Sequence, residues 1–91
     1  MISVKRHGGV LAACDASLLG KKFEENELVL DIKKSFYGGQ LIEEKELTEL
    51  LLTATNINLV GEQTIRIAKK KGIVSQTGKI GGIPYAMIFK V

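Results

Sequence analysis

The amino-acid sequence predicts an α+β fold with a mostly antiparallel sheet, two helices packed on one side and a C-terminal strand within the sheet. The first third alternates apolar and polar residues, as in ISVKR and ELVLDI, which is typical of β-strands. Two later segments instead space their apolar residues as a helix does. Strand patterns precede helix patterns, an order that favours a segregated α+β fold. With 91 residues, the chain is expected to form a single domain, residues 1–91.

Residues 2–15 are expected to form an N-terminal β-hairpin, because ISVKR and VLAAC flank the short turn sequence HGG. Gly8 and Gly9 tolerate the positive φ angles that a two-residue primed turn needs. The returning strand is apolar on both faces, which predicts a central position in the sheet. Asp15 is then expected to cap one helical turn, and Gly20 to end it in the left-handed conformation.

The next strand pattern, ELVLDI, follows a turn that is expected at Asn26. Alternation predicts that three of its residues face the core: Leu28, Leu30 and Ile32. If the strand continues, Phe36 keeps this inward parity while Tyr37 points to the other side. The sequence thus predicts a buried, structural Phe36 and an exposed Tyr37 that is available for binding.

Two amphipathic helices are predicted after this strand. The first lies in IEEKELTELLLTATN and has four apolar residues at helical spacing: Leu47, Leu50, Leu51 and Ala54. The second lies in GEQTIRIAKKKG, where Ile65 and Ala68 share one face and Gly72 can end the helix. Its last three lysines, Lys69, Lys70 and Lys71, are consecutive, so each points about 100° away from the one before. They are therefore expected to spread around the helix end and not to form one stripe.

The C-terminal segment is expected to form strands. IVSQTGKI indicates a short hairpin that turns at Thr77 and Gly78, and PYAMIFKV indicates a closing strand that Pro84 must open. Four residues are predicted to share one face of this strand: Tyr85, Met87, Phe89 and Val91. Phe89 and Leu50 are both predicted to be core positions, where alanine would cost about 2–5 kcal/mol.

Composition excludes several classes of function. The chain has no run of about 20 apolar residues, and its first residues, MISVKRHGG, have no apolar h-region. We therefore expect a cytoplasmic protein with no signal peptide and no membrane partner. One cysteine and one histidine can form neither an internal disulfide nor a four-ligand zinc site. A Cys14–His7 dyad is disfavoured because the hairpin separates the two residues. We therefore expect no catalytic residues, no metal and no cofactor.

Two groups of residues are candidates for binding. The first combines glycines, which allow close backbone approach, with rings that can stack on a ligand: Tyr37, Gly38, Gly39, Gly81, Gly82 and Tyr85. The second would form a basic, phosphate-binding surface if its members gather: Lys21, Lys22, Lys33, Lys34, Arg66 and Lys70. The alternative for the Tyr-Gly-Gly loop is a purely structural joint, and the glutamates of EEKELTEL are expected to form a solvated helix face.

Four motifs together suggest a family. They are AACD..LLGK.F, LVLDIK.SFYGG.L, NLVGE.TI..A...GIV and IGG.P.A, in this order between Gly9 and Phe89. The chain resembles the archaeal family known as domain of unknown function 424. The resemblance implies an archaeal, cytoplasmic, single-domain protein. That family often has histidine at the position of Tyr85 and aspartate at that of Glu43, so acid–base chemistry by a histidine beside Pro84 is not expected here.

The net charge of +3 and the lack of a catalytic set favour a non-catalytic binding module that associates with RNA or a ribonucleoprotein. One alternative is a protein–protein interaction or assembly module that pairs an apolar sheet surface with another chain. Another is a small-molecule binder or enzyme that uses four polar residues: Tyr37, Asp15, Glu62 and Tyr85. The sequence sets neither the oligomeric state nor the grouping of the lysines.

Overall fold

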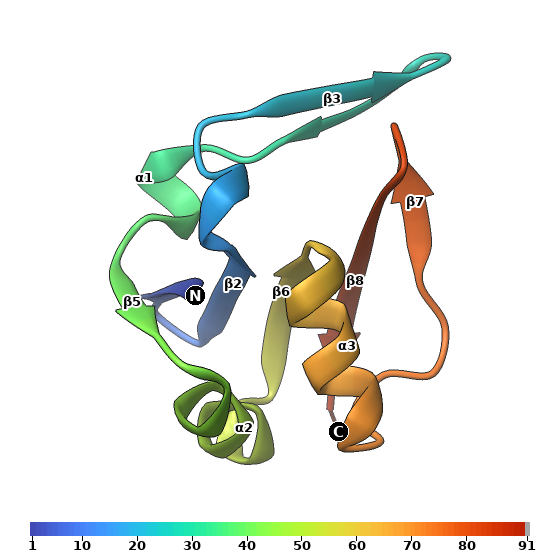
Figure 1. The fold of residues 1–91 in the computed structure, drawn as a ribbon. Helices are drawn as coiled ribbons and strands as arrows, with labels where there is room; N and C mark the ends of the chain where they lie inside the picture. The colour runs from blue at the N-terminus through green and yellow to red at the C-terminus, as the bar shows by residue number, and fades with distance from the viewer. Residues whose placement is uncertain (91) are drawn as a thin grey trace.

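A computed structural model describes residues 1–90, which form a six-stranded sheet, a separate two-stranded hairpin and three helices (Figure 1). The strands are β1 (Ile2–His7), β2 (Val10–Asp15), β3 (Lys22–Glu25), β4 (Leu28–Asp31), β5 (Gln40–Ile42), β6 (Asn56–Val60), β7 (Gly78–Ile80) and β8 (Ile83–Phe89). The helices are α1 (Lys34–Tyr37), α2 (Glu44–Thr53) and α3 (Glu62–Lys70), with a 3-10 turn at Ala16–Leu18. The strand order of the large sheet is β5-β1-β2-β6-β8-β7.

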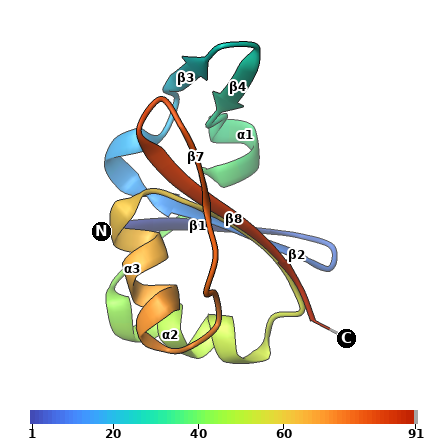
Figure 2. The same cartoon turned by 90° about the vertical axis from the view of Figure 1, so that its right-hand side faces the viewer.

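The predicted α+β fold is confirmed. In the large sheet β2 and β6 run parallel, and the other neighbouring strands run antiparallel. Both long helices, α2 and α3, lie on one face of this sheet (Figure 2). We call that face the helix face. The opposite face, which carries α1 and the β3–β4 hairpin, we call the second face.

The main core lies between the helix face and the two long helices. α2 contributes Leu47 and Leu51, and α3 contributes Ile65 and Ala68, all of them buried as the helical spacing predicts. Leu50 is half-buried at the edge of this core. Helices of ten and nine residues are marginal in water on their own, so burial of these apolar stripes is what stabilises them.

The predicted central strand and the predicted inner C-terminal strand both occur. β2 lies between β1 and β6, and β8 lies between β6 and β7. The C-terminal strand is not the neighbour of the N-terminal hairpin, because β6 is inserted between them. β6 can occupy this place because its buried residues Ile57 and Leu59 point into the main core.

The strand pattern at ELVLDI does form a strand, β4, but this strand lies outside the large sheet. It pairs only with β3, across a turn at Asn26 whose φ of 57° matches the predicted left-handed residue. Of the three residues that were expected to face the core, Leu28 is exposed, Leu30 is half-buried and Ile32 is buried. The prediction for Leu28 is wrong because a projecting two-stranded ribbon has no second layer to cover its far end.

The C-terminal hairpin turns at Gly81 and Gly82, not at Thr77 and Gly78 as predicted. Both Gly81 and Gly82 have positive φ (58° and 82°), which suits a tight primed turn between β7 and β8. The predicted core position at Phe89 is also wrong, since its side chain is 72% exposed. Phe89 does lie on the same face of the strand as Tyr85 and Met87, as predicted, but no other element covers that face at this end. Val91, which was predicted to share this face, lies outside the described residues.

The segment around Phe36 and Tyr37 forms a single helical turn, α1, and not a continued strand. In a helical turn neighbouring side chains do not alternate between two faces as they do in a strand. The prediction that Phe36 is buried and Tyr37 exposed, which assumed a strand, therefore does not hold. Tyr37 is 8% exposed and packs on Ala12 and Cys14, whereas Phe36 is half-buried and stacks on His7 with ring centroids 4.6 Å apart. The prediction that Tyr37 is exposed is therefore wrong.

Polar side chains of β1 hold α1 on the second face. Ser3 Oγ donates to the Tyr37 carbonyl at 2.8 Å, and Lys5 Nζ donates to the Ser35 carbonyl at 2.9 Å. His7 Nε2 lies 2.8 Å from the Phe36 carbonyl and must carry the hydrogen, because a carbonyl only accepts. Alternate residues of one strand thus satisfy three carbonyls at the end of a helical turn.

Asp15 caps a helix, but not the one that follows it in sequence. It makes no side-chain cap bond to the 3-10 turn. Its carboxylate instead accepts hydrogen bonds from the Gln63 N–H (3.1 Å), the Thr64 N–H (2.8 Å) and the Thr64 hydroxyl (2.7 Å). These groups belong to the first turn of α3, where free N–H groups need acceptors. Asp15 is therefore a long-range N-cap that ties α3 to the end of β2.

Candidate functional site

A cleft lies between the β3–β4 hairpin and the second face of the sheet. Its volume is about 190 Å³, and we call it the tyrosine cleft. Residues from five elements line it: Val29, Leu30, Tyr37, Asn58, Leu59, Val60, Ile80, Tyr85, Ala86 and Met87. Two of the predicted binding residues, Tyr37 and Tyr85, thus meet in one place although they are far apart in sequence. No side chain in this lining is charged.

Three side chains give the tyrosine cleft its polar groups. They are the side chains of Tyr37, Tyr85 and Asn58, the three polar residues of the lining. No fully buried side-chain nitrogen or oxygen within residues 1–90 lacks a hydrogen-bond partner. The Tyr37 hydroxyl has no hydrogen bond within these residues, so it is not fully enclosed by the protein. Burial, and then the nearby Cys14, raise the pKa of Tyr37. Its hydroxyl is therefore neutral at pH 7 and can both donate and accept.

The ring of Tyr85 is held in place by a glycine on the edge strand. Gly78 of β7 pairs with Tyr85 of β8, and a Cβ at Gly78 would lie 2.6–2.7 Å from the Tyr85 ring and hydroxyl. The ring therefore lies directly over the Gly78 backbone. Gly81, in the turn beyond, packs against Phe23 and donates its N–H to Glu25 Oε1 at 3.0 Å. These contacts hold the β7–β8 turn against the β3–β4 hairpin.

Gly38 and Gly39 do not line the tyrosine cleft. A Cβ at Gly38 would lie 2.6 Å from the Lys34 carbonyl oxygen, and one at Gly39 would lie 2.4 Å from the Val4 carbonyl oxygen. Both glycines are thus required for close packing of the chain as it leaves α1 and enters β5. Their role here is the structural joint that the sequence left open as an alternative.

The six residues of the predicted basic surface fall into two groups. Four surround the base of the β3–β4 hairpin: Lys21, Lys22, Lys33 and Lys34. In this group Lys33 Nζ lies 3.9 Å from Asp31 Oδ2, a long and exposed ion pair. The other two, Arg66 and Lys70, lie on α3 on the helix face. The structure therefore does not gather all six residues into one patch.

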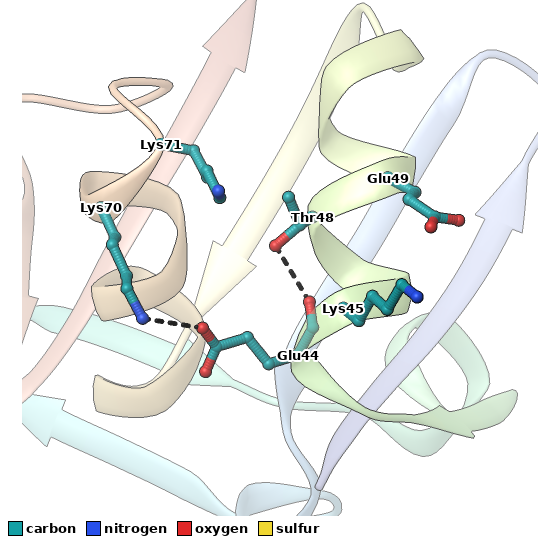
Figure 3. A pocket seen from close by; sticks show the side chains of 6 residues that line it. All are labelled: Glu44, Lys45, Thr48, Glu49, Lys70 and Lys71. Carbon is teal, nitrogen blue, oxygen red and sulfur yellow. Dashed lines mark hydrogen bonds and ion pairs between the residues drawn. The ribbon is translucent and has the colours of Figure 1, made fainter.

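Lys70 lies in a groove between α2 and α3, where it is paired with Glu44. Lys70 Nζ donates to Glu44 Oε2 at 3.0 Å, and Thr48 Oγ1 donates to the Glu44 carbonyl at 3.0 Å (Figure 3). The hydrogen bond and charge of Lys70 lower the pKa of Glu44, with smaller contributions from Arg66 and Lys71. Lys70 thus has a counter-ion within the protein. Lys45 belongs to the same groove but points away from α3 (Figure 3).

A second group of cations gathers between α3 and the β7–β8 hairpin. Arg66 and Lys69 lie one helical turn apart on α3, and Lys79 reaches the same hollow from β7. The hollow measures about 280 Å³ and has Glu62 as its one carboxylate; we call it the cationic hollow. Within residues 1–90, none of these three cations forms an ion pair. The sequence interpretation missed Lys69 and Lys79, although the spacing of Arg66 and Lys69 already indicated one helix face.

The residues that would serve an enzyme are not assembled in one place. Asp15 caps α3, Glu62 lies in the cationic hollow, and the two tyrosines lie in the tyrosine cleft. Within the part of the chain that the structure describes, no three His, Cys, Asp or Glu residues are placed to hold a metal ion. No helix of residues 1–90 is long and apolar enough to cross a membrane.

Cys14 is expected to react slowly with iodoacetamide at neutral pH. Its side chain is fully buried, and burial, followed by the charge of Asp15, raises its pKa from 9.0 to about 12. The reactive thiolate is therefore scarce in the native protein. The neutral thiol also contributes stability that is full below about pH 9 and is lost as the pH rises toward 12. Mass spectrometry of native and guanidinium-unfolded protein checks this: only the unfolded chain should be labelled quickly, and fast native labelling would show an accessible Cys14.

The fold described above is that of a small α+β protein. The chain belongs to the family described as "Protein of unknown function (DUF424)", which matches residues 2–91. A crystal structure of an uncharacterized conserved protein from the archaeon Methanopyrus kandleri is similar, with a TM-score of 0.78 and 26% sequence identity. That similarity covers 99% of this chain and 93% of the archaeal chain. No curated protein matches. The family resemblance seen in the sequence is thus confirmed.

Proposed function

We propose that this protein is a non-catalytic module that binds RNA through the cationic hollow. The observation that carries the proposal is the convergence of Arg66, Lys69 and Lys79 from two elements. Like charges at this spacing repel one another, by a few tenths of a kcal/mol per pair on a helix. Glu62 supplies a single negative charge against three positive ones. An anionic ligand with several phosphates would remove that repulsion.

RNA fits this hollow better than a single small anion does. The cations are exposed on an open surface, which suits a backbone that passes across it. Two observations support a binding role over catalysis: Cys14 is buried with a raised pKa, and His7 is held by the Phe36 carbonyl. Neither side chain is placed to attack or to transfer a proton at the cationic hollow.

The proposal predicts salt-dependent binding of single-stranded RNA. In fluorescence anisotropy titrations between about 50 and 200 mM salt, log K should fall linearly with log salt concentration, with a slope near −2 for three phosphate contacts. Arg66→Ala, Lys69→Ala or Lys79→Ala should each weaken binding and reduce the slope by about 0.7. These side chains are exposed, so the variants should fold normally.

Lys45→Ala is the matched control, because it removes the same charge from an exposed position on α2 that points away from α3 (Figure 3). It should leave the RNA affinity nearly unchanged. Lys70→Ala should also have a small effect, since Lys70 is paired with Glu44. Equal losses in Lys45→Ala and Arg66→Ala would mean that only net charge matters, and undetectable RNA binding at low salt would refute the proposal.

A second candidate function is a protein–protein interaction. Its support is a set of apolar side chains that are 51–76% exposed on the hairpin and on the open end of the second face: Leu28, Val29, Met87 and Phe89. Exposed apolar clusters often mark interfaces. Association through them would be insensitive to salt, unlike phosphate binding. Sedimentation of wild type and of a Met87→Ser/Phe89→Ser variant would detect self-association and its loss.

A further inference from the structure

We propose that the tyrosine cleft binds one uncharged heteroaromatic ring, the base of a nucleoside. The proposal goes beyond phosphate binding, because the cleft lies on the opposite face of the sheet from the cationic hollow and uses other residues. It rests on the size of the cleft, on its uncharged lining and on the three polar side chains in that lining.

The size and walls of the cleft select a flat, uncharged group. About 190 Å³ is smaller than the roughly 300–1,000 Å³ of pockets for whole drug-sized ligands, so the cleft has room for a single ring system. Val29 and Leu30 of the hairpin form one wall, and Ile80 and Met87 of the sheet form another. With no charged side chain in the lining, a charged group that entered would lose its hydration without a partner.

The polar groups of the cleft suit the edge of a nucleobase. The Asn58 amide offers both a donor and an acceptor, the pair that can bind a base edge at two points. The hydroxyls of Tyr37 and Tyr85 add two groups that donate or accept as needed. The Tyr85 ring is already fixed over Gly78, so little side-chain freedom is lost when a ligand contacts it.

The two sites lie on either side of a single edge strand. In β7, Lys79 lines the cationic hollow and the next residue, Ile80, lines the tyrosine cleft, because neighbouring side chains of a strand point to opposite faces. β7 is the last strand of the large sheet, so no further strand of that sheet pairs with its outer edge. An RNA strand that crosses this edge would place phosphates on one side and a base on the other.

The test uses free nucleosides, which carry no phosphate and so do not depend on the cationic hollow. Adenosine, guanosine, cytidine and uridine are titrated separately into ¹⁵N-labelled protein. For at least one nucleoside we expect saturable shifts of the Asn58 side-chain amide and of the Val60, Tyr85 and Met87 backbone amides. Asn58→Ala should weaken that binding about tenfold, the equivalent of one lost hydrogen bond.

Asn56→Ala is the matched control. Asn56 lies two residues earlier on β6, on the same face, and does not line the cleft. It should keep wild-type affinity, and Tyr85→Phe, which retains the ring, should bind better than Tyr85→Ala. Arg66→Ala should lose RNA affinity but bind the nucleoside normally, which separates this proposal from the proposed function. The absence of localised shifts with all four nucleosides, or equal losses in Asn56→Ala and Asn58→Ala, would overturn it.

Discussion

Replacement of Leu51 by alanine is expected to lower the free energy of unfolding by about 2–5 kcal/mol. Leu51 lies on α2, is 0% exposed and belongs to the main core beneath the sheet. Truncation removes its buried apolar surface and leaves a cavity that the neighbouring strands cannot fill, because β-sheet backbone is held by its own hydrogen bonds. Urea denaturation followed by far-UV circular dichroism measures the loss.

Leu52→Ala is the control for this prediction. Leu52 is the next residue on the same helix, has the same side chain and is 63% exposed. Its replacement should change the free energy of unfolding by no more than about 0.5 kcal/mol. If both variants lost similar stability, the helix itself and not core packing would be responsible. If Leu51→Ala lost less than about 0.5 kcal/mol, α2 would not pack as described.

Asp15→Ala is expected to cost about 2–3 kcal/mol of unfolding free energy. The carboxylate accepts three hydrogen bonds from the start of α3, and hydrogen bonds to charged groups contribute more than neutral ones. Loss of an N-cap alone costs about 0.5–2 kcal/mol. The larger value expected here reflects the Thr64 hydroxyl, which is fully buried and would lose its acceptor. Thermal and urea denaturation would both report the change.

Asp31→Ala provides the comparison for Asp15→Ala. Asp31 is exposed and has only a 3.9 Å contact with Lys33, so its loss should be nearly neutral. Gly61→Ala should also lower the free energy of unfolding, because the new methyl group would displace the Asp15 carboxylate from the start of α3. Gly61 has a φ of 109°, and a Cβ there would lie 2.4 Å from the Asp15 carboxyl carbon. An Asp15→Ala variant as stable as Asp31→Ala would show that the cap contributes little.

The sequence predicts the two long helices, the N-terminal hairpin and the parity of β8 correctly, because these features follow from local spacing. The helices with Leu47 and Ile65, the hairpin turn at Gly8 and the central β2 are all confirmed. What local spacing does not show is which face another layer covers. Phe89 has the expected parity yet is exposed, because the β3–β4 hairpin covers only part of the second face. Partners distant in sequence decided this outcome, and no local pattern encodes them.

The candidate site was predictable only in part, for the same reason. Tyr37 and Tyr85 were chosen as separate ring-bearing residues, and the fold brings them together in one cleft. Asn58 resembles any polar residue of a strand until the register of β6 and β8 places it opposite Met87. Asp15 was predicted as a cap, but the helix that it caps begins more than 40 residues later. Each miss concerns a contact between segments that only the complete topology brings together.

The parallel pairing of β2 with β6 divides the large sheet into two halves that are each continuous in sequence. β5, β1 and β2 come from residues 2–42, and β6, β8 and β7 come from residues 56–89. Within this sheet, only β1–β2 and β7–β8 pair across short turns. Paired residues are at most 40 positions apart between β1 and β5 (Ile2 with Ile42), and at most 33 apart between β6 and β8 (Asn56 with Phe89). Joining the two halves pairs residues that are 46 positions apart, such as Cys14 with Val60, so it closes the longest loop in the sheet. Non-local closures of this kind slow folding. The pairing of β2 with β6 is therefore expected to be the last of the sheet's pairings to form, and the hydrogen bonds of Asp15 to α3 then hold the end of this pairing together.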